Sequence, residues 1–387
     1  MGVLQRDTGL GANRSPRGYG AKAIKFRHYF KKLRAVAQPH SARMLYRQLL
    51  PVVLPGSRPT SPHALILTYH RVENLDSDPQ MLCVTPQRFA EQMSVLRKCF
   101  RVVPLQQLVK QIRGGERTAN TVAISFDDGY ADNLLHAKPL LERHDVPATV
   151  FIASDYVGGR ATFWWDELES ILLGNDALPQ KLRLAIDGQL FFWDLGEDAL
   201  HVDPSHEPGQ WHVECGTMPS RRHRIYQALH QVLYTMSADK RDALLGKLRA
   251  WAGRSQQPRE SHRTMTHSEL ASLAQCPLVE IGAHTATHPA LSMLPPHQQD
   301  AEIRDGKIRL EQMIGRETNS FAYPYGSLTS FNDTTSRLVQ AAGFSLACTT
   351  FTDSVRAGCD AFQLPRLPVR NWNGEEFERY LTGWATH

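Results

Sequence analysis

Short apolar runs alternate with amphipathic stretches along most of this chain, and no other feature limits the possible folds as much. Before residue 160 the strand-like runs are Ala64–Tyr69, Thr121–Phe126 and Ala148–Ala153. Between them, apolar residues at helical spacing cover Thr85–Cys99, Leu105–Ile112 and Asn133–His144. Strands that alternate with helices are typical of a parallel sheet joined by helical crossovers. The sequence therefore predicts an α/β fold.

The alternation breaks at about residue 162 and resumes at about residue 262, which indicates an insertion into the α/β body. Within it we expect a helix that opens at Phe163, a hairpin over Leu182–Leu195 that turns at Asp187-Gly188, and a helix over Arg221–Trp251. After it, a capping box at Thr266 begins the next helix. The later strands are expected at Leu278–Ile281, Ser320–Tyr323, Leu346–Thr349 and Phe362–Arg366.

The first 60 residues differ from the rest in charge. They hold twelve Lys or Arg residues and one acidic residue, Asp7, whereas the remainder holds 32 basic and 38 acidic residues. From Ala23 to Ala37 apolar residues follow helical spacing with Lys and Arg between them, as in a basic amphipathic helix on an anionic membrane. A solvated tail and a helix that caps the domain are alternatives, and Met44 is an alternative start. We therefore expect an arm, residues 1–60, and a catalytic body, residues 61–387.

Composition bears on the compartment and on the partners. No stretch approaches the roughly 20 uninterrupted apolar residues that span a bilayer, and none has the form of a secretory signal. The six cysteines contain no C-x-x-C pair, which favours a reducing compartment over a disulfide framework. We expect a cytoplasmic protein, with the arm as a means of peripheral attachment to the inner membrane face. The acidic body argues against a nucleic-acid partner.

Two polar motifs follow apolar runs in the body and carry the candidate chemistry. In Asp127-Asp128-Gly129, the glycine permits a sharp turn at a strand end, after which both carboxylates can face one site. His284 and His288 are four residues apart, so one helical turn or a tight loop puts both imidazoles on one side. One carboxylate and two imidazoles suit Zn²⁺ or a similar ion, and the second carboxylate stays free as a base. A surface turn and a solvent-facing histidine pair are the alternatives.

The order and spacing of these motifs resemble those of the polysaccharide deacetylases of the NodB-homology group, carbohydrate esterase family 4. Ser125-Phe126-Asp127-Asp128-Gly129 is similar to the first family motif, His284-Thr285-Ala286-Thr287-His288 to the second, and Ala322-Tyr323-Pro324-Tyr325-Gly326 to the third. The resemblance spans about Ala64 to Val369, apart from the insertion. It implies a distorted (β/α) barrel with about seven parallel strands.

The resemblance also implies a role for each motif residue. Asp127 would be the general base, and the N–H of Tyr325 would line the oxyanion hole. Asp128, His284 and His288 would bind a divalent metal ion, with Zn²⁺ expected first and Co²⁺ or Ni²⁺ as alternatives.

The chain departs from the family pattern in two respects. Ala322 stands where an arginine normally steadies the base; Arg366 is our candidate to replace it, and a surface arginine is the alternative. No late motif supplies the usual acid histidine. Thr68-Tyr69-His70-Arg71-Val72 resembles the early Tyr-His motif of the subgroup that includes biofilm poly-N-acetylglucosamine deacetylases. His70 is therefore our candidate acid, with a structural histidine as the alternative.

The leading hypothesis is a metal-dependent hydrolase that removes N-acetyl groups from a sugar or polysaccharide in a glycan pathway. A deformylase or other amidase acting on a lipid-linked sugar would use the same mechanism, and the basic arm would suit it. A non-catalytic glycan-binding module is the third hypothesis, although such a module has no use for a free Asp127. Trp164, Trp165 and Trp372 are candidates to stack on sugar rings, with core packing as the alternative.

Overall fold

The computed structural model describes residues 63–158, 162–200, 211–255 and 259–385, and the structural statements that follow concern these ranges. The predicted basic arm, residues 1–60, lies outside them, so the interpretation of that arm stays a prediction. No helix within these ranges is long and apolar enough to cross a membrane.

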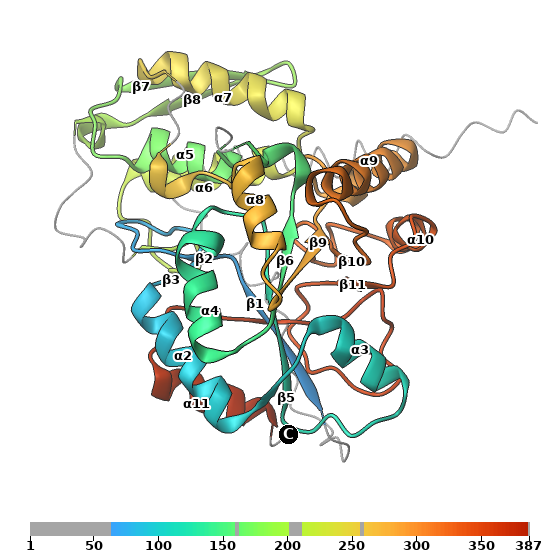
Figure 1. Ribbon diagram of the computed structural model, residues 1–387. Helices are drawn as coiled ribbons and strands as arrows, with labels where there is room; N and C mark the ends of the chain where they lie inside the picture. The colour runs from blue at the N-terminus through green and yellow to red at the C-terminus, as the bar shows by residue number, and fades with distance from the viewer. Residues whose placement is uncertain (1–62, 159–161, 201–210, 256–258, 386–387) are drawn as a thin grey trace, which may run out of the picture. The chain divides into compact units, whose positions relative to one another are not determined.

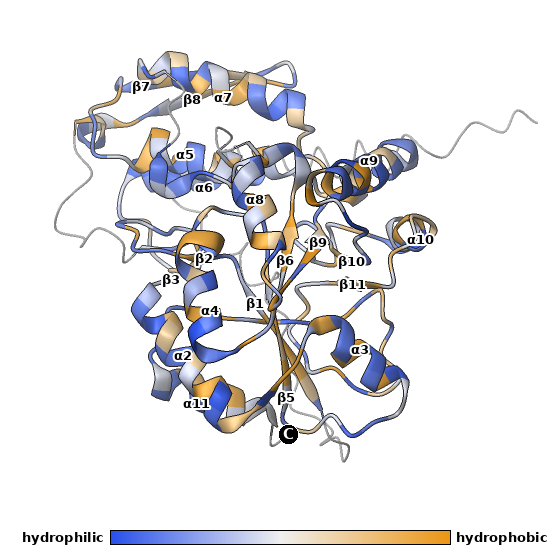
Figure 2. Ribbon diagram, in the orientation of Figure 1, coloured by the Kyte–Doolittle hydropathy of each residue, from blue (hydrophilic) through white to orange (hydrophobic). Residues whose placement is uncertain are grey.

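A parallel sheet forms the centre of the body (Figure 1). Its seven strands follow the order β11-β10-β9-β6-β5-β1-β12, and a short eighth strand, β4 (Arg101–Val102), also pairs with β5. The seven are β1 (Ala64–Tyr69), β5 (Thr121–Phe126), β6 (Ala148–Ile152), β9 (Val279–Ala283), β10 (Ser320–Ala322), β11 (Leu346–Cys348) and β12 (Leu367–Pro368). Every pairing along this path is parallel. Apolar runs place these strands in the core, where Figure 2 shows β5, β6 and β9 as hydrophobic.

The sheet curls so that its two edge strands approach one another. Cys348 of β11 forms a parallel bridge with Leu364, three residues before β12. The predicted distorted (β/α) barrel is therefore confirmed. The strand expected at Phe362–Arg366 is wrong in its bounds, because that segment makes the single bridge at Leu364 and the ladder with β1 begins at Leu367.

Helices cover the sheet and connect its strands. Local signals set two of their starts: Thr85 accepts a hydrogen bond from the Arg88 N–H at the start of α2, and Thr266 and Glu269 form the predicted capping box of α8. The stretch expected as one helix over Asn133–His144 begins as a π-helical turn, Asn133–Ala137, and continues as α4. The helices are α2 (Pro86–Cys99), α3 (Leu105–Arg113), α4 (Lys138–His144), α8 (His267–Ala274), α9 (Pro296–Ile314), α10 (Asp333–Ala341) and α11 (Gly374–Ala385).

The segment between β6 and α8 folds outside the main sheet. Its helices are α5 (Trp164–Leu173), α6 (Arg221–Tyr234) and α7 (Ala238–Ala252), and its hairpin is β7 (Lys181–Ile186) with β8 (Gln189–Asp194). Figure 1 draws the hairpin beside α7. The single helix expected over Arg221–Trp251 is wrong, because α6 ends at Tyr234 and α7 begins at Ala238, after Ser237 in an extended conformation.

Candidate metal centre and acid–base site

The turn after β5 brings two neighbouring carboxylates to the same rim of the barrel. The Asp127 N–H still follows the sheet, donating to the Tyr69 carbonyl at 3.0 Å, but Asp128 and Gly129 have φ of 78° and 85°. A Cβ at Gly129 would also lie 2.9 Å from Ile152 Cδ1, so the end of that side chain would have to shift. The sequence predicts the turn at Gly129. That Asp128 itself adopts the left-handed conformation is an additional finding.

The two histidines lie on a tight loop after β9, one of the two arrangements that the sequence left open. Thr285 and His288 both have positive φ, 66° and 54°, and the His288 N–H donates to Thr285 Oγ1 at 3.0 Å. Glu302 of α9 holds the loop from outside: its carboxylate accepts from the N–H groups of Ala286 and Thr287, at 3.1 and 2.8 Å, and from Thr287 Oγ1 at 2.6 Å.

Asp128, His284 and His288 converge on one point. Their ligand atoms all lie within 4.8 Å of one another, and Asp128 Oδ1 is 3.6 Å from His284 Nε2 and 3.3 Å from His288 Nε2. All three side chains are buried. This set is what a divalent cation prefers: one carboxylate, two imidazoles and open positions.

The protonation of this cluster also suits a cation. His284 Nδ1 lies 2.8 Å from the Ala322 carbonyl, which can only accept, so the proton is on Nδ1 and the Nε2 lone pair faces Asp128. Burial lowers the pKa of His288 to about 4, which keeps its imidazole neutral. Burial alone would raise the pKa of Asp128, but the two imidazoles beside it hold that pKa well below its usual value. The residues present therefore fit a metal ion.

Arg366 fixes the other carboxylate, Asp127. Arg366 Nη1 and Nη2 donate to Asp127 Oδ1 and Oδ2, each at 2.7 Å, while its Nε donates to the Thr349 carbonyl. Arg366 is 1% exposed, which excludes a surface arginine. Burial alone would raise the pKa of Asp127, but the charge of Arg366 and its hydrogen bonds lower it, so the carboxylate is ionised. The site thus holds an ionised acid outside the metal-ligand set.

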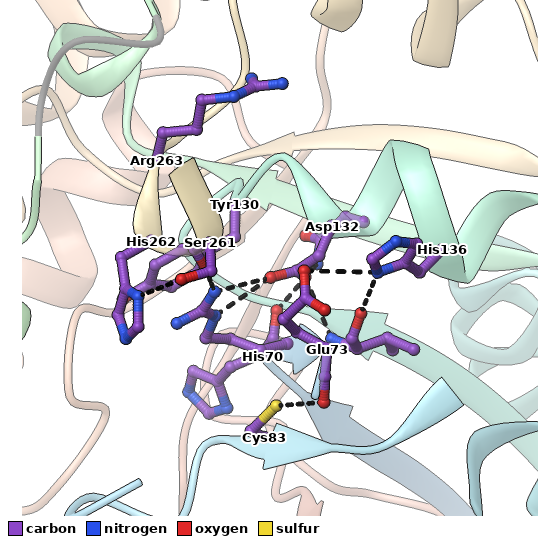
Figure 3. A network of polar contacts seen from close by, with 12 residues as sticks. His70, Glu73, Cys83, Tyr130, Asp132, His136, Ser261, His262 and Arg263 are labelled. Carbon is purple, nitrogen blue, oxygen red and sulfur yellow. Dashed lines mark hydrogen bonds and ion pairs between the residues drawn. The ribbon is translucent and has the colours of Figure 1, made fainter. Parts of the chain in front are cut away.

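His70 follows β1 at the same rim. The Asn133 side chain donates to its carbonyl at 2.8 Å, and the next residue, Arg71, is buried in an ion pair with Asp132 at 3.0 Å. Figure 3 shows His70 beside this network, which includes Tyr130 and Ser261. Burial lowers the pKa of His70, and the charges of Asp128 and Asp127 partly oppose that shift. The imidazole therefore lies within electrostatic reach of both carboxylates.

Aromatic side chains surround His288. Its ring centroid is 5.7 Å from Phe163, 5.1 Å from Trp165 and 4.7 Å from Tyr325. Tyr325 has φ of 61°, and its N–H finds no acceptor among the described residues, as an oxyanion donor requires. Trp164 donates from Nε1 to the Tyr325 hydroxyl at 2.9 Å.

The three tryptophans that are candidates for sugar stacking differ in position. Trp164 and Trp165 are 3% and 5% exposed and pack next to the site. Trp372 instead packs against Tyr380 of α11, at 4.6 Å between ring centroids, and on the hydrophobic core.

Sequence reasoning missed two groups that hold the histidines in place. Glu302 has no motif around it, and only the packing of α9 against the loop brings it there; a Cβ at Gly306 of the same helix would meet Ala286 N at 2.7 Å. The partner of His284 is a backbone carbonyl, Ala322 O, which side-chain identity cannot reveal. Only the third motif, which contains residue 322, indicated that this strand end belongs to the site.

Parts of this chain are similar in sequence to known polysaccharide deacetylases. The family model described as "Polysaccharide deacetylase" matches residues 114–175 and 251–347. A relative named as a polysaccharide deacetylase, YxkH of Bacillus subtilis strain 168, is 26% identical over 118 residues. That match covers 30% of this chain and 41% of the relative.

Two solved structures share the fold. The deacetylase PplD of Streptococcus pyogenes, in complex with acetate, has a TM-score of 0.50 and 17% identity, and the match covers 83% of this chain and 98% of that one. IcaB from Ammonifex degensii has a TM-score of 0.50 and 18% identity, with 84% and 98% covered. The chain is therefore similar to the polysaccharide deacetylases over the two matched segments of its sequence, and it shares the barrel fold of these two structures.

Proposed function

We propose that this protein is a metal-dependent hydrolase that removes N-acetyl groups from a sugar or polysaccharide. One observation carries the proposal: an ionised carboxylate, Asp127, is held by Arg366 beside a separate cluster of three metal-ligand side chains. A metal-dependent amide hydrolase of this kind needs a base that is not itself a metal ligand, and Asp127 meets that requirement.

Each residue of the site has a part in the reaction. A divalent ion held by Asp128, His284 and His288 would polarise the amide carbonyl and a water molecule. Asp127 accepts the proton of the attacking water, and Arg366 keeps that carboxylate ionised and oriented. The Tyr325 N–H donates to the oxygen that becomes negative in the tetrahedral intermediate. His70 donates a proton to the leaving amine.

Asp127→Asn tests the role of the base. We expect the variant to lose acetate release from N-acetylated oligosaccharides by at least about 100-fold, the lower end of what a general base contributes. Its fold, measured by circular dichroism, should match the parent because asparagine can still accept from Arg366. An equally active variant would remove Asp127 from the mechanism.

The same assay separates the rival functions. Formate released from an N-formylated sugar, with no acetate from any N-acetylated one, would favour the deformylase. Binding of oligosaccharides with no acyl group released from either would favour the glycan-binding module. His70→Ala tests the proposed acid. This variant should slow cleavage of an amide far more than cleavage of an activated ester, whose leaving group needs no proton.

A further inference from the structure

Four arginine side chains are buried among the described residues, and three of them have evident partners. Arg71 pairs with Asp132, and Arg366 pairs with Asp127. Arg222 donates to four backbone carbonyl oxygens. The fourth, Arg241 of α7, is 2% exposed and differs from the others.

The guanidinium of Arg241 lacks a negative partner within the described part of the chain. No carboxylate oxygen there lies within 4.0 Å of it. Its Nη1 is 3.5 Å from the Tyr325 hydroxyl, a long hydrogen bond to a neutral group, and its Cζ lies 5.7 Å from the centre of the Trp164 ring. Neither neighbour neutralises a positive charge, and burying an unpaired charge is costly.

The position of Arg241 connects it to the metal centre. Tyr325, which its Nη1 reaches, packs its ring 4.7 Å from that of the metal-ligand candidate His288. The guanidinium is therefore one side chain away from the site where the acyl group would bind. Arg241 also belongs to the insertion and lies outside the residues that the family model matches, so the charge is a property of this chain's own insertion.

We propose that Arg241 binds an anionic substituent, a carboxylate or a phosphate, on the N-acetylated sugar that this enzyme takes. The inference rests on the proposed function for the rest of the ligand. A guanidinium presents N–H groups in a fork that matches the oxygens of either anion, and such charge-assisted bonds are strong in a site that excludes water. The bound anion would supply the negative charge that no described residue provides to Arg241.

The test compares three probes that share one acetylated amino sugar. These are neutral N-acetylglucosamine, N-acetylmuramic acid, which adds a carboxylate, and N-acetylglucosamine 6-phosphate. Binding is measured by calorimetry on the full-length, zinc-loaded Asp127→Asn protein, which should not consume them. We expect one charged probe to bind about 10- to 100-fold tighter than the neutral one, as expected for hydrogen bonds between charged groups. The preferred probe identifies whether the anion is a carboxylate or a phosphate.

In the Asp127→Asn background, Arg241→Gln should remove the preference for the charged probe. It should leave the affinity for the neutral probe within about twofold. Arg241→Lys, which keeps the charge, should retain part of the preference. Lys240→Gln is the matched control, because it removes a positive charge from the adjacent, exposed residue and should keep the preference. Circular dichroism verifies the fold of each variant.

Three results would overturn the anion site. These are no preference for a charged probe in the parent protein, a preference that survives Arg241→Gln, or an equal loss for all three probes, which would mean that Arg241 merely positions Tyr325. If the preference holds but active protein releases no acetate from any probe, the anion site stands and the proposed function fails.

Discussion

Asp127 is a buried carboxylate whose ionisation depends on the guanidinium beside it. Burial raises its pKa, and Arg366 is the largest of the influences that lower it. In the proposed mechanism Asp127 must be ionised to accept a proton, so we expect activity to be lost as the pH falls through the pKa of Asp127. The two hydrogen bonds at 2.7 Å from Arg366 also fix the direction in which the carboxylate points.

Arg366→Lys keeps a positive charge but cannot donate to both oxygens of Asp127 in the same fork. We expect kcat to fall about 10- to 100-fold. The acid limb of the kcat–pH profile should move to higher pH, because the pKa of Asp127 rises when its partner weakens. Arg337→Gln, on the exposed face of α10, is the control for lost charge. An acid limb that stays in place would show that Arg366 does not set the ionisation of the base.

The loop between β9 and α9 carries both histidines, and its shape depends on a residue of the helix that follows. Three hydrogen bonds from the loop converge on the Glu302 carboxylate. Two loop residues, Thr285 and His288, have positive φ, which costs energy in non-glycine residues and persists only where the surroundings enforce it.

Glu302→Ala removes all three hydrogen bonds, and we expect the affinity for Zn²⁺ to fall about 10- to 100-fold, as is usual when groups that orient metal ligands are lost. The affinity is measured by competition with a chromophoric chelator. Asp305→Asn removes a charge from the exposed face of the same helix and should leave the affinity unchanged. Unchanged zinc affinity in Glu302→Ala would mean that the loop keeps its shape without the Glu302 carboxylate.

Local sequence signals predict some parts of this structure, and tertiary packing alone determines others. The strand end at Phe126 follows from its apolar run, whereas β9 continues two residues beyond the expected end at Ile281, to Ala283. The motifs after both strands supply ligand types at a spacing that a turn can use. The break before α7 also had a local signal, Ser237 at the N-cap position, which the long helical pattern around it obscured. Glu302 and Arg241 could not be foreseen, because only tertiary packing brings them to the site.

Across the whole chain, charge is divided between a basic arm and an acidic body. We propose that the arm holds the enzyme at an anionic membrane surface, where it would meet substrates carried on lipids. The arm holds almost no acidic residues, so phosphatidylglycerol vesicles should attract it and salt should release it.

Deletion of residues 1–43, which begins the chain at Met44, should abolish co-sedimentation with phosphatidylglycerol vesicles and leave activity on a soluble substrate unchanged. Vesicles of phosphatidylcholine alone serve as the control, since they carry no net charge. Equal sedimentation of the deleted and full-length proteins would contradict a role for the arm at the membrane.

The proposed mechanism gives the adjacent residues Asp127 and Asp128 different roles, base and metal ligand. Zinc content per chain, measured by inductively coupled plasma mass spectrometry on zinc-loaded, dialysed proteins, separates them directly. We expect about one ion in the parent protein and in Asp127→Asn, but little in Asp128→Asn, because we propose Asp128 as a ligand, whereas Asp127 is bound by Arg366. Full zinc retention by Asp128→Asn, or loss of zinc from Asp127→Asn, would contradict the assignment of the metal centre.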